Sequence, residues 1–141
     1  MRVIIVCTGN TCRSPMAEAI YKEKFGNKAD FISRGLYVEE ERSASYNAEA
    51  AMKQMGLDIS AHKSKQLTEK EAMDAGLILT ATSAHRDRIL AVLPELRGKV
   101  FTLCEYAGLP FDDIPDPFGG DIEAYEGCAE TIKKAAEATE F

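Results

Sequence analysis

Four short apolar runs alternate along this chain with stretches of helical periodicity. The runs have the length and the aliphatic or β-branched content of buried strands, and they cover residues 2–6, 30–33, 77–80 and 100–103. Strands that alternate with helices are joined by right-handed crossovers into a parallel sheet with helices on both faces. We therefore predict a single α/β domain over residues 1–141, built on a four-stranded parallel sheet.

Capping residues and apolar spacing mark the intervening helices. They predict helices that begin near Ser14, Ser45, Thr68, Ser83 and Asp121. In open parallel sheets, ligands bind beyond the carboxyl ends of the strands. The loops that follow the strands are therefore the places where a functional site is expected.

A cysteine and an arginine lie six positions apart in the loop after the first predicted strand. The loop sequence is Cys7-Thr8-Gly9-Asn10-Thr11-Cys12-Arg13, and Ser14 follows as the predicted hydroxyl cap of a helix. Backbone N–H groups at a helix start lack helical partners, so they can surround an oxyanion while the helix dipole favours its charge. The residues predicted to bind phosphate are Thr8, Gly9, Asn10, Thr11, Cys12, Arg13, Ser14 and, from a later loop, Phe118.

Cys7 is the predicted nucleophile of this loop, and Arg13 is the predicted phosphate clamp. The field that binds an anion also favours the thiolate of Cys7, and a planar guanidinium can hold two phosphate oxygens. A single cysteine after a strand is usually a packing residue. What indicates phosphoryl chemistry is the six-position spacing from cysteine to arginine in a loop that joins a strand to a helix. A nucleotide P-loop is excluded, because it would end in Gly-Lys-Ser/Thr.

Phosphoryl transfer also needs a proton for the leaving group, and Asp116 is the predicted general acid. Residues 111–120 are too rich in proline and glycine for a helix, so a loop is expected there. The proline that follows favours extended backbone at Asp116, and Phe118 can form an apolar pocket wall. Asp112 and Asp113 are the local alternatives, but neither has a proline and an aromatic residue immediately after it.

Composition excludes several classes of partner. The 141 residues carry a formal net charge of −6, which argues against an extended nucleic-acid surface. No apolar run approaches the length of about 20 residues that a membrane span needs, and no secretion signal is present. We therefore expect a cytoplasmic protein without a membrane partner, and we favour a monomer.

The four cysteines lack the spacing and the histidine partners of a closed metal site, so we predict neither a metal nor another cofactor. Four residues separate Cys7 from Cys12. Cys12 is either a packing residue or a resolving thiol that forms a reversible disulfide with an oxidised Cys7. It is the redox candidate of the chain.

Residues 7–18, together with the Asp-Pro pair at 116–117, resemble the low-molecular-weight protein tyrosine phosphatase family. The resemblance covers essentially the whole chain and implies a four-stranded flavodoxin-like fold. It also implies phosphorylated proteins as substrates and a mechanism that needs no metal.

The same resemblance implies a role for each motif residue. Cys7 is the nucleophile, Arg13 the phosphate clamp and Asp116 a general acid that later activates water against the cysteinyl-phosphate. Asn10 and Ser14 match positions that order the loop and stabilise the thiolate by hydrogen bonding.

Two features are similar to the bacterial protein arginine phosphatases within that family. These features are Thr11 and the segment Phe118-Gly119-Gly120. Tyrosine-specific relatives generally carry a bulkier aliphatic residue at the position of Thr11 and a tyrosine-rich segment after the Asp-Pro pair. A threonine hydroxyl can hydrogen-bond a guanidinium, whereas an aliphatic side chain packs against an aromatic ring. The resemblance therefore favours phosphoarginine in proteins as the substrate.

Three other functions stay open. A phosphotyrosine phosphatase would share the mechanism and differ in substrate. An arsenate reductase would need two further cysteines that pass a disulfide outward, and Cys104 and Cys128 lie 24 positions apart. A binding module without turnover would not need Cys7, Arg13 and Asp116 together.

Several other residues have expected positions outside the catalytic set. Arg34 occupies a place near the sheet edge where the family usually has a small residue. His62 is expected to bond nearby backbone. Tyr106 is expected in an exposed loop and Tyr125 on the last helix, both as packing residues.

Overall fold

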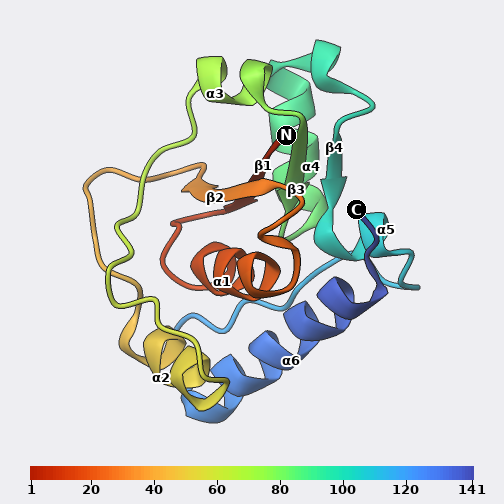
Figure 1. The fold of residues 1–141 in the computed structure, drawn as a ribbon. Helices are drawn as coiled ribbons and strands as arrows, with labels where there is room; N and C mark the ends of the chain where they lie inside the picture. Colours follow the sequence, from red (N-terminus) through yellow and green to blue (C-terminus); the bar gives the residue numbers. More distant parts are fainter.

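The computed structural model, which describes residues 1–141, contains the four-stranded parallel sheet that the sequence predicts. Its strands are β1 (Arg2–Cys7), β2 (Asp30–Gly35), β3 (Leu77–Thr80) and β4 (Val100–Thr102), in the spatial order β2-β1-β3-β4. The register pairs Cys7 with Gly35 and Val6 with Thr80. The carboxyl ends of β1, β2 and β3 therefore meet at one edge of the sheet, beside Cys7 (Figure 1).

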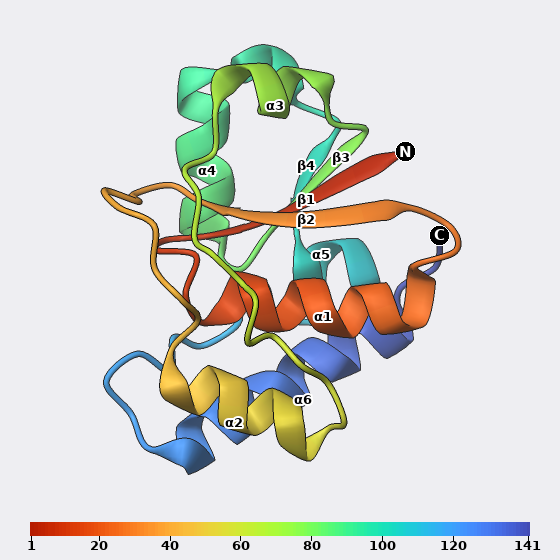
Figure 2. The ribbon, with the colours of Figure 1, turned by 60° about the vertical axis from the view of Figure 1, so that its left-hand side comes forward.

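Helices cover both faces of the sheet, as Figure 2 shows. One face carries α1 (Arg13–Phe25), α5 (Leu103–Ala107) and α6 (Ile122–Ala138), with α2 (Tyr46–Gln54) packed further out against α1 and α6. The other face carries α3 (Glu69–Asp74), α4 (Ser83–Val92) and the 3₁₀ turn η1 (Pro94–Leu96). No helix combines the length and the apolar content that a membrane span requires.

The two faces of the sheet bury cores of very different size. Val3, Ile5 and Cys7 belong to a cluster of 26 buried apolar residues on the α1 face. Ile4 and Val6 alternate with them and belong to a cluster of 9 on the α3–α4 face. Most of the hydrophobic stabilisation therefore comes from the α1 face, and the thinner α3–α4 face leaves an apolar groove open to solvent.

Two helix starts differ from the prediction because another residue supplies the cap. Thr82, not Ser83, caps α4, and its hydroxyl oxygen accepts a backbone N–H of the first turn. Leu103 begins α5 and does not end the fourth strand, because Thr102 and Glu105 form a capping box there. In both places a threonine just after or at the end of a strand caps the helix.

Ser14 and Tyr106 also lie elsewhere than expected. Ser14 lies inside α1, whose cap residue Cys12 makes no side-chain capping bond. Tyr106 lies in α5, where its ring packs against the rings of Phe101 and Phe141. The Ser14 hydroxyl is therefore available to the loop that precedes α1.

Arg34 forms a two-point ion pair that connects β2 to α3. Its Nη2 lies 2.8 Å and its Nε 3.0 Å from Oε2 of Glu71. Burial raises the pKa of the Glu71 carboxyl, but hydrogen bonds from Arg34 and Thr68 outweigh burial and hold that pKa below its usual value. The residue that departs from the family pattern therefore has a structural partner.

The segment between α5 and α6 crosses the carboxyl ends of the strands without regular structure. Ile114 is fully buried, and its N–H donates to the carbonyl of Ala81 at 2.8 Å. The Ser83 N–H donates to Oδ1 of Asp113 at 2.8 Å. These bonds hold the Asp116 loop against the end of β3 and the start of α4.

Candidate active site

A pocket of about 240 Å³ opens where β1 ends and α1 begins. Its lining residues are Cys7, Thr8, Gly9, Thr11, Cys12, Arg13, Asp116 and Phe118. The cavity therefore brings together the three predicted catalytic residues, although Asp116 comes from a distant loop. Asn10 and Ser14, which were also predicted to bind phosphate, are fully buried behind the loop and do not line the cavity.

Asn10 and Ser14 form a chain of hydrogen bonds that ends on the sulfur of Cys7. The Lys65 N–H donates to Oδ1 of Asn10 at 2.9 Å, which fixes the orientation of that amide. The amide Nδ2 then donates to the Ser14 hydroxyl oxygen at 2.6 Å, so the hydroxyl proton is free to donate to Cys7 Sγ, 3.0 Å away. A hydrogen bond donated by Ser14 can stabilise negative charge on the Cys7 sulfur during catalysis.

Asn10 also holds the shape of the catalytic loop. Its backbone has a φ of 58°, a left-handed conformation that asparagine tolerates better than most residues. The side-chain amide of Asn10 donates to the hydroxyl of Ser33 on β2 at 3.0 Å. The backbone carbonyl oxygen of Asn10 lies 2.7 Å from Nε2 of His62. His62 therefore bonds nearby backbone, as expected, and the sequence analysis did not anticipate Ser33.

Arg13 faces the pocket from a buried position, with 6% of its surface exposed. Its Nη1 donates to the carbonyl oxygen of Ile114 at 3.0 Å, and its Nη2 lies 3.7 Å from Oδ2 of Asp116. A guanidinium has five N–H donors, so donors remain for an anion in the cavity. The Asp116 loop thus helps to orient the arginine.

Asp116 is distinguished from its two neighbours by location. Its side chain is half exposed, lines the pocket and accepts the N–H of Phe118 through Oδ1 at 3.1 Å. Asp113 bonds to the start of α4, and Asp112 is exposed outside the pocket. Phe118 lies at the cavity with 77% of its surface exposed.

His85 contacts the catalytic loop, and the sequence analysis missed it. Its Nε2 lies 2.8 Å from the Thr8 hydroxyl oxygen, while its Nδ1 accepts the N–H of Thr82 at 3.2 Å. Burial, followed by the charge of Arg13, lowers the pKa of His85 to about 4. The available signal was Thr82-x-x-His85, a capping box in which histidine takes the usual place of Glu or Gln.

Cys12 lines the pocket next to polar neighbours. Its sulfur lies 3.4 Å from the hydroxyl of Tyr125 and 3.5 Å from that of Ser45. Tyr125 is buried on α6, and burial raises its pKa. All four cysteines are free thiols in this structure.

Cys104 and Cys128 are buried and do not line the pocket. Burial raises the pKa of Cys104 to about 11 and that of Cys128 to about 12. Both thiols are therefore protonated near neutral pH and are poor candidates for the disulfide relay of an arsenate reductase. No group of three or more His, Cys, Asp or Glu side chains has the arrangement of a metal site.

Comparison with known families decides which chemistry this cavity belongs to. Residues 2–139 match a family model described as low molecular weight phosphotyrosine protein phosphatase. The chain belongs to this family. The low-molecular-weight phosphatase fold predicted from the sequence is thereby confirmed.

Relatives of this phosphatase carry two different substrate names. A protein-arginine-phosphatase of Geobacillus stearothermophilus is 39% identical over 94% of this chain and 88% of the relative. A low molecular weight protein-tyrosine-phosphatase, PtpB of Staphylococcus epidermidis, is 38% identical over 89% of this chain and 87% of the relative. Overall identity therefore separates the two substrate classes poorly.

A solved structure connects the fold to its chemistry. The YwlE arginine phosphatase, in a cysteine-to-serine mutant with a phosphorylated active-site serine, has a TM-score of 0.90 and 34% identity. The alignment covers 98% of this chain and 92% of that one. The phosphatase described here is thus an enzyme of a family that uses a cysteine nucleophile.

Proposed function

We propose that this phosphatase hydrolyses phosphoarginine in proteins through a cysteinyl-phosphate intermediate. The observation that carries the choice of substrate is the position of Thr11 on the pocket wall. Its side chain carries a hydroxyl, whereas tyrosine-specific relatives generally have an aliphatic side chain at this position. A guanidinium presents only N–H donors, so it needs acceptors such as the Thr11 oxygen and a carboxyl oxygen of Asp116. The similarity to a protein-arginine-phosphatase supports the same choice.

In the first step, the Cys7 thiolate attacks the phosphorus. An S–P bond forms while the P–N bond breaks, and its electron pair moves to the guanidine nitrogen, which takes a proton from Asp116. Arg13 and the backbone N–H groups of the loop hold the phosphoryl oxygens throughout. The buried Arg13 suits this task because Ile114 already orients its guanidinium.

In the second step, water hydrolyses the cysteinyl-phosphate. Asp116, now a carboxylate, accepts a proton from the attacking water, an O–P bond forms and the S–P bond breaks. The electron pair returns to the sulfur of Cys7, where the hydrogen bond from Ser14 stabilises the departing thiolate. Phosphate leaves and the enzyme is regenerated without a metal ion.

A phosphotyrosine substrate is the second candidate, and Phe118 is the observation in its favour. The exposed Phe118 ring at the cavity can pack against a phenol ring, and aromatic pairs of this kind stabilise binding. Attack by Cys7 and the two roles of Asp116 would be unchanged, because only a P–O bond replaces the P–N bond.

The test compares kcat/KM on matched phosphoarginine and phosphotyrosine peptides. We expect the wild type to prefer phosphoarginine by at least about tenfold, and Thr11→Ile to shift the ratio toward phosphotyrosine, because a polar acceptor is replaced by an aliphatic surface. Thr11→Ser retains the hydroxyl and is the matched control. A wild type that prefers phosphotyrosine would overturn the assignment.

We also propose that the enzyme acts in the cytoplasm on phosphorylated proteins. A thiolate nucleophile and three further free cysteines suit a compartment in which thiols are kept reduced. There, Cys12 would act as the resolving thiol that captures an oxidised Cys7 as a reversible disulfide.

A further inference from the structure

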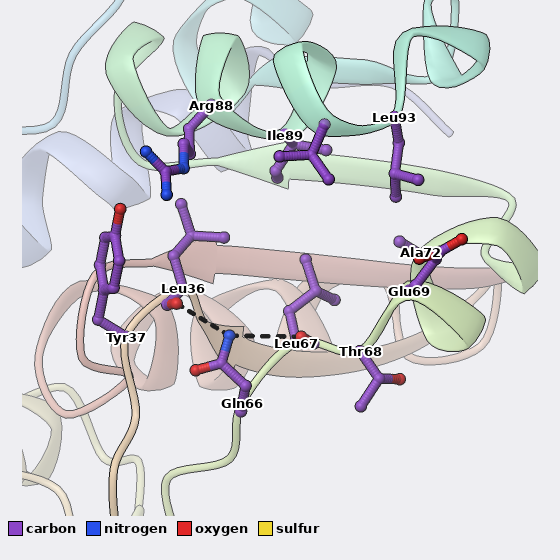
Figure 3. A pocket seen from close by; sticks show the side chains of 11 residues that line it. Leu36, Tyr37, Gln66, Leu67, Thr68, Glu69, Ala72, Arg88, Ile89 and Leu93 are labelled. Atoms are coloured by element: carbon purple, nitrogen blue, oxygen red, sulfur yellow. Dashed lines mark hydrogen bonds between the residues drawn. The ribbon is translucent and has the colours of Figure 1, made fainter.

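A second concavity, of about 180 Å³, lies on the α3–α4 face of the molecule. Figure 3 shows it between α4 and the chain that leads into α3. Leu36, Leu67, Ala72, Ile89 and Leu93 form its apolar lining. Tyr37 and Arg88 lie together at one end, and Glu69 lies toward the other (Figure 3). We call this concavity the α4 groove.

The α4 groove adjoins the catalytic loop through its Tyr37 end. The Leu36 N–H donates to the carbonyl of Cys7 at 3.1 Å, and the Tyr37 N–H donates to that of Thr8 at 3.0 Å. The opposite wall is α4, which touches Thr8 through His85, one turn before Arg88. The two concavities share no lining residue, so they are distinct sites that these contacts connect.

The end of the α4 groove nearest the catalytic loop has the composition of a protein-binding hot spot. The Arg88 guanidinium carbon lies 5.6 Å from the centre of the Tyr37 ring, and 58% of Tyr37 is exposed. Tyrosine and arginine are enriched among residues that dominate protein interfaces. Arg88 is in none of the ion pairs of the structure, although the chain as a whole is acidic. A carboxylate on a partner would complement it.

We propose that the α4 groove is a docking subsite for the protein substrate itself. The groove receives a large apolar side chain of the substrate that lies near the phosphorylated residue. A carboxylate adjacent to this apolar residue pairs with Arg88. This inference rests on the proposed function, because it needs a phosphorylated protein in the neighbouring pocket. The apolar lining selects the side chain, and the contacts with the catalytic loop place it within a few residues of the phosphoryl group.

The first experiment compares Arg88→Glu with Arg97→Glu, a charge reversal at an exposed arginine outside both concavities. One substrate is an aryl phosphate. The others are a series of polar phosphopeptides of about 13 residues, each with a single Asp-Leu pair, and the pair is moved by one position from each peptide to the next. We expect one position of the pair to lower the wild-type KM by about tenfold, and Arg88→Glu to abolish that gain. Turnover of the aryl phosphate should not change in either variant.

A second variant keeps the test independent of the charge. Val92 lines the α4 groove with 65% of its surface exposed, so Val92→Ser should fold normally and weaken the Leu-dependent gain in part. If no peptide position lowers KM, or if Arg97→Glu has the same effect as Arg88→Glu, the docking proposal is wrong. Dimerisation that Arg88→Glu abolishes, with peptide KM unchanged, would assign the groove to a second copy and would overturn it as well.

Failure of the docking proposal can be separated from failure of the proposed function. Each peptide is made with phosphoarginine and with phosphotyrosine in the same sequence. A Leu-dependent gain seen only with phosphotyrosine would support the α4 groove and reject the arginine assignment. Efficient phosphoarginine turnover with no decrease in KM at any position of the Asp-Leu pair would support the arginine assignment and reject the docking proposal.

Discussion

His85 Nε2 lies 2.8 Å from the hydroxyl oxygen of Thr8, and this contact ties α4 to the catalytic loop. Because Nδ1 accepts the N–H of Thr82, the neutral ring carries its proton on Nε2 and donates it to Thr8. The Thr8 hydroxyl proton is then left free for a ligand in the pocket. A pKa of about 4 keeps His85 in this neutral form at physiological pH.

Acid should destabilise the fold through His85. An unfolded histidine titrates near its ordinary pKa of 6.5, whereas folded His85 titrates near 4, so between these values the unfolded chain binds more protons. The contribution of His85 is complete above pH 6.5 and is lost as the pH falls toward 4. Urea unfolding should show that, between pH 6.5 and pH 4, the free energy of unfolding falls by on the order of 2 kcal/mol more in the wild type than in His85→Gln. Equal pH dependence of the two proteins would contradict the prediction.

Removal of the Ser14 hydroxyl should make Cys7 less reactive. Ser14→Ala deletes the donor 3.0 Å from the sulfur, so the nucleophile loses a hydrogen bond that stabilises negative charge on it. We expect alkylation of Cys7 by iodoacetamide to slow by about tenfold, which mass spectrometry of the modified peptide can follow. Ser43→Ala, at an exposed serine outside the pocket, is the control and should match wild type.

Neutralising Asp116 should remove acid–base catalysis and leave phosphate binding largely intact. Asp116→Asn is expected to lower kcat by about 10²- to 10⁴-fold while the inhibition constant of inorganic phosphate changes little. Asp112→Asn and Asp113→Asn are the matched controls, because neither side chain lines the pocket. A comparable loss of kcat in Asp113→Asn would mean that the wrong carboxylate has been identified.

Cys12 should protect Cys7 from irreversible oxidation. After mild peroxide treatment, wild-type activity is expected to return on addition of a thiol, because a Cys7–Cys12 disulfide is reducible. In Cys12→Ser, recovery should fall and a sulfinic or sulfonic acid should accumulate on Cys7, as mass spectrometry would detect. Cys104→Ser lacks a thiol far from the pocket and should recover like wild type.

Local patterns in the sequence predicted the part of the site that the chain builds within one loop. Cys7 and Arg13 lie on one strand-loop-helix unit, so their spacing alone indicates that they meet. Ser33 and His85 could not be found this way, because their contacts depend on the register of β2 and on the start of α4. Asp116 was predicted from a local motif, but its distance from Arg13 depends on how Ile114 anchors the loop.

The boundary errors have a similar cause. Thr102 both ends β4 and caps α5, and Thr82 caps α4 two residues after β3 ends; a short apolar run in the sequence does not locate such caps. Ser14 matched the residue type of a cap, but its hydroxyl bonds to Cys7. At Ser14 a hydrogen bond to the end of β1 decided the outcome, whereas at Thr82 and Thr102 a local capping box did.

Arg13 donates its orienting hydrogen bond to the carbonyl oxygen of Ile114, 101 residues further along the chain. During synthesis, Cys7 and Arg13 therefore leave the ribosome well before the residue that orients the arginine. A nascent chain that ends before this point holds a thiol beside an unoriented guanidinium and has no Asp116. Phosphatase activity therefore requires the segment from Ile114 to Asp116 to be docked at the pocket, and activity can serve as a readout of that docking.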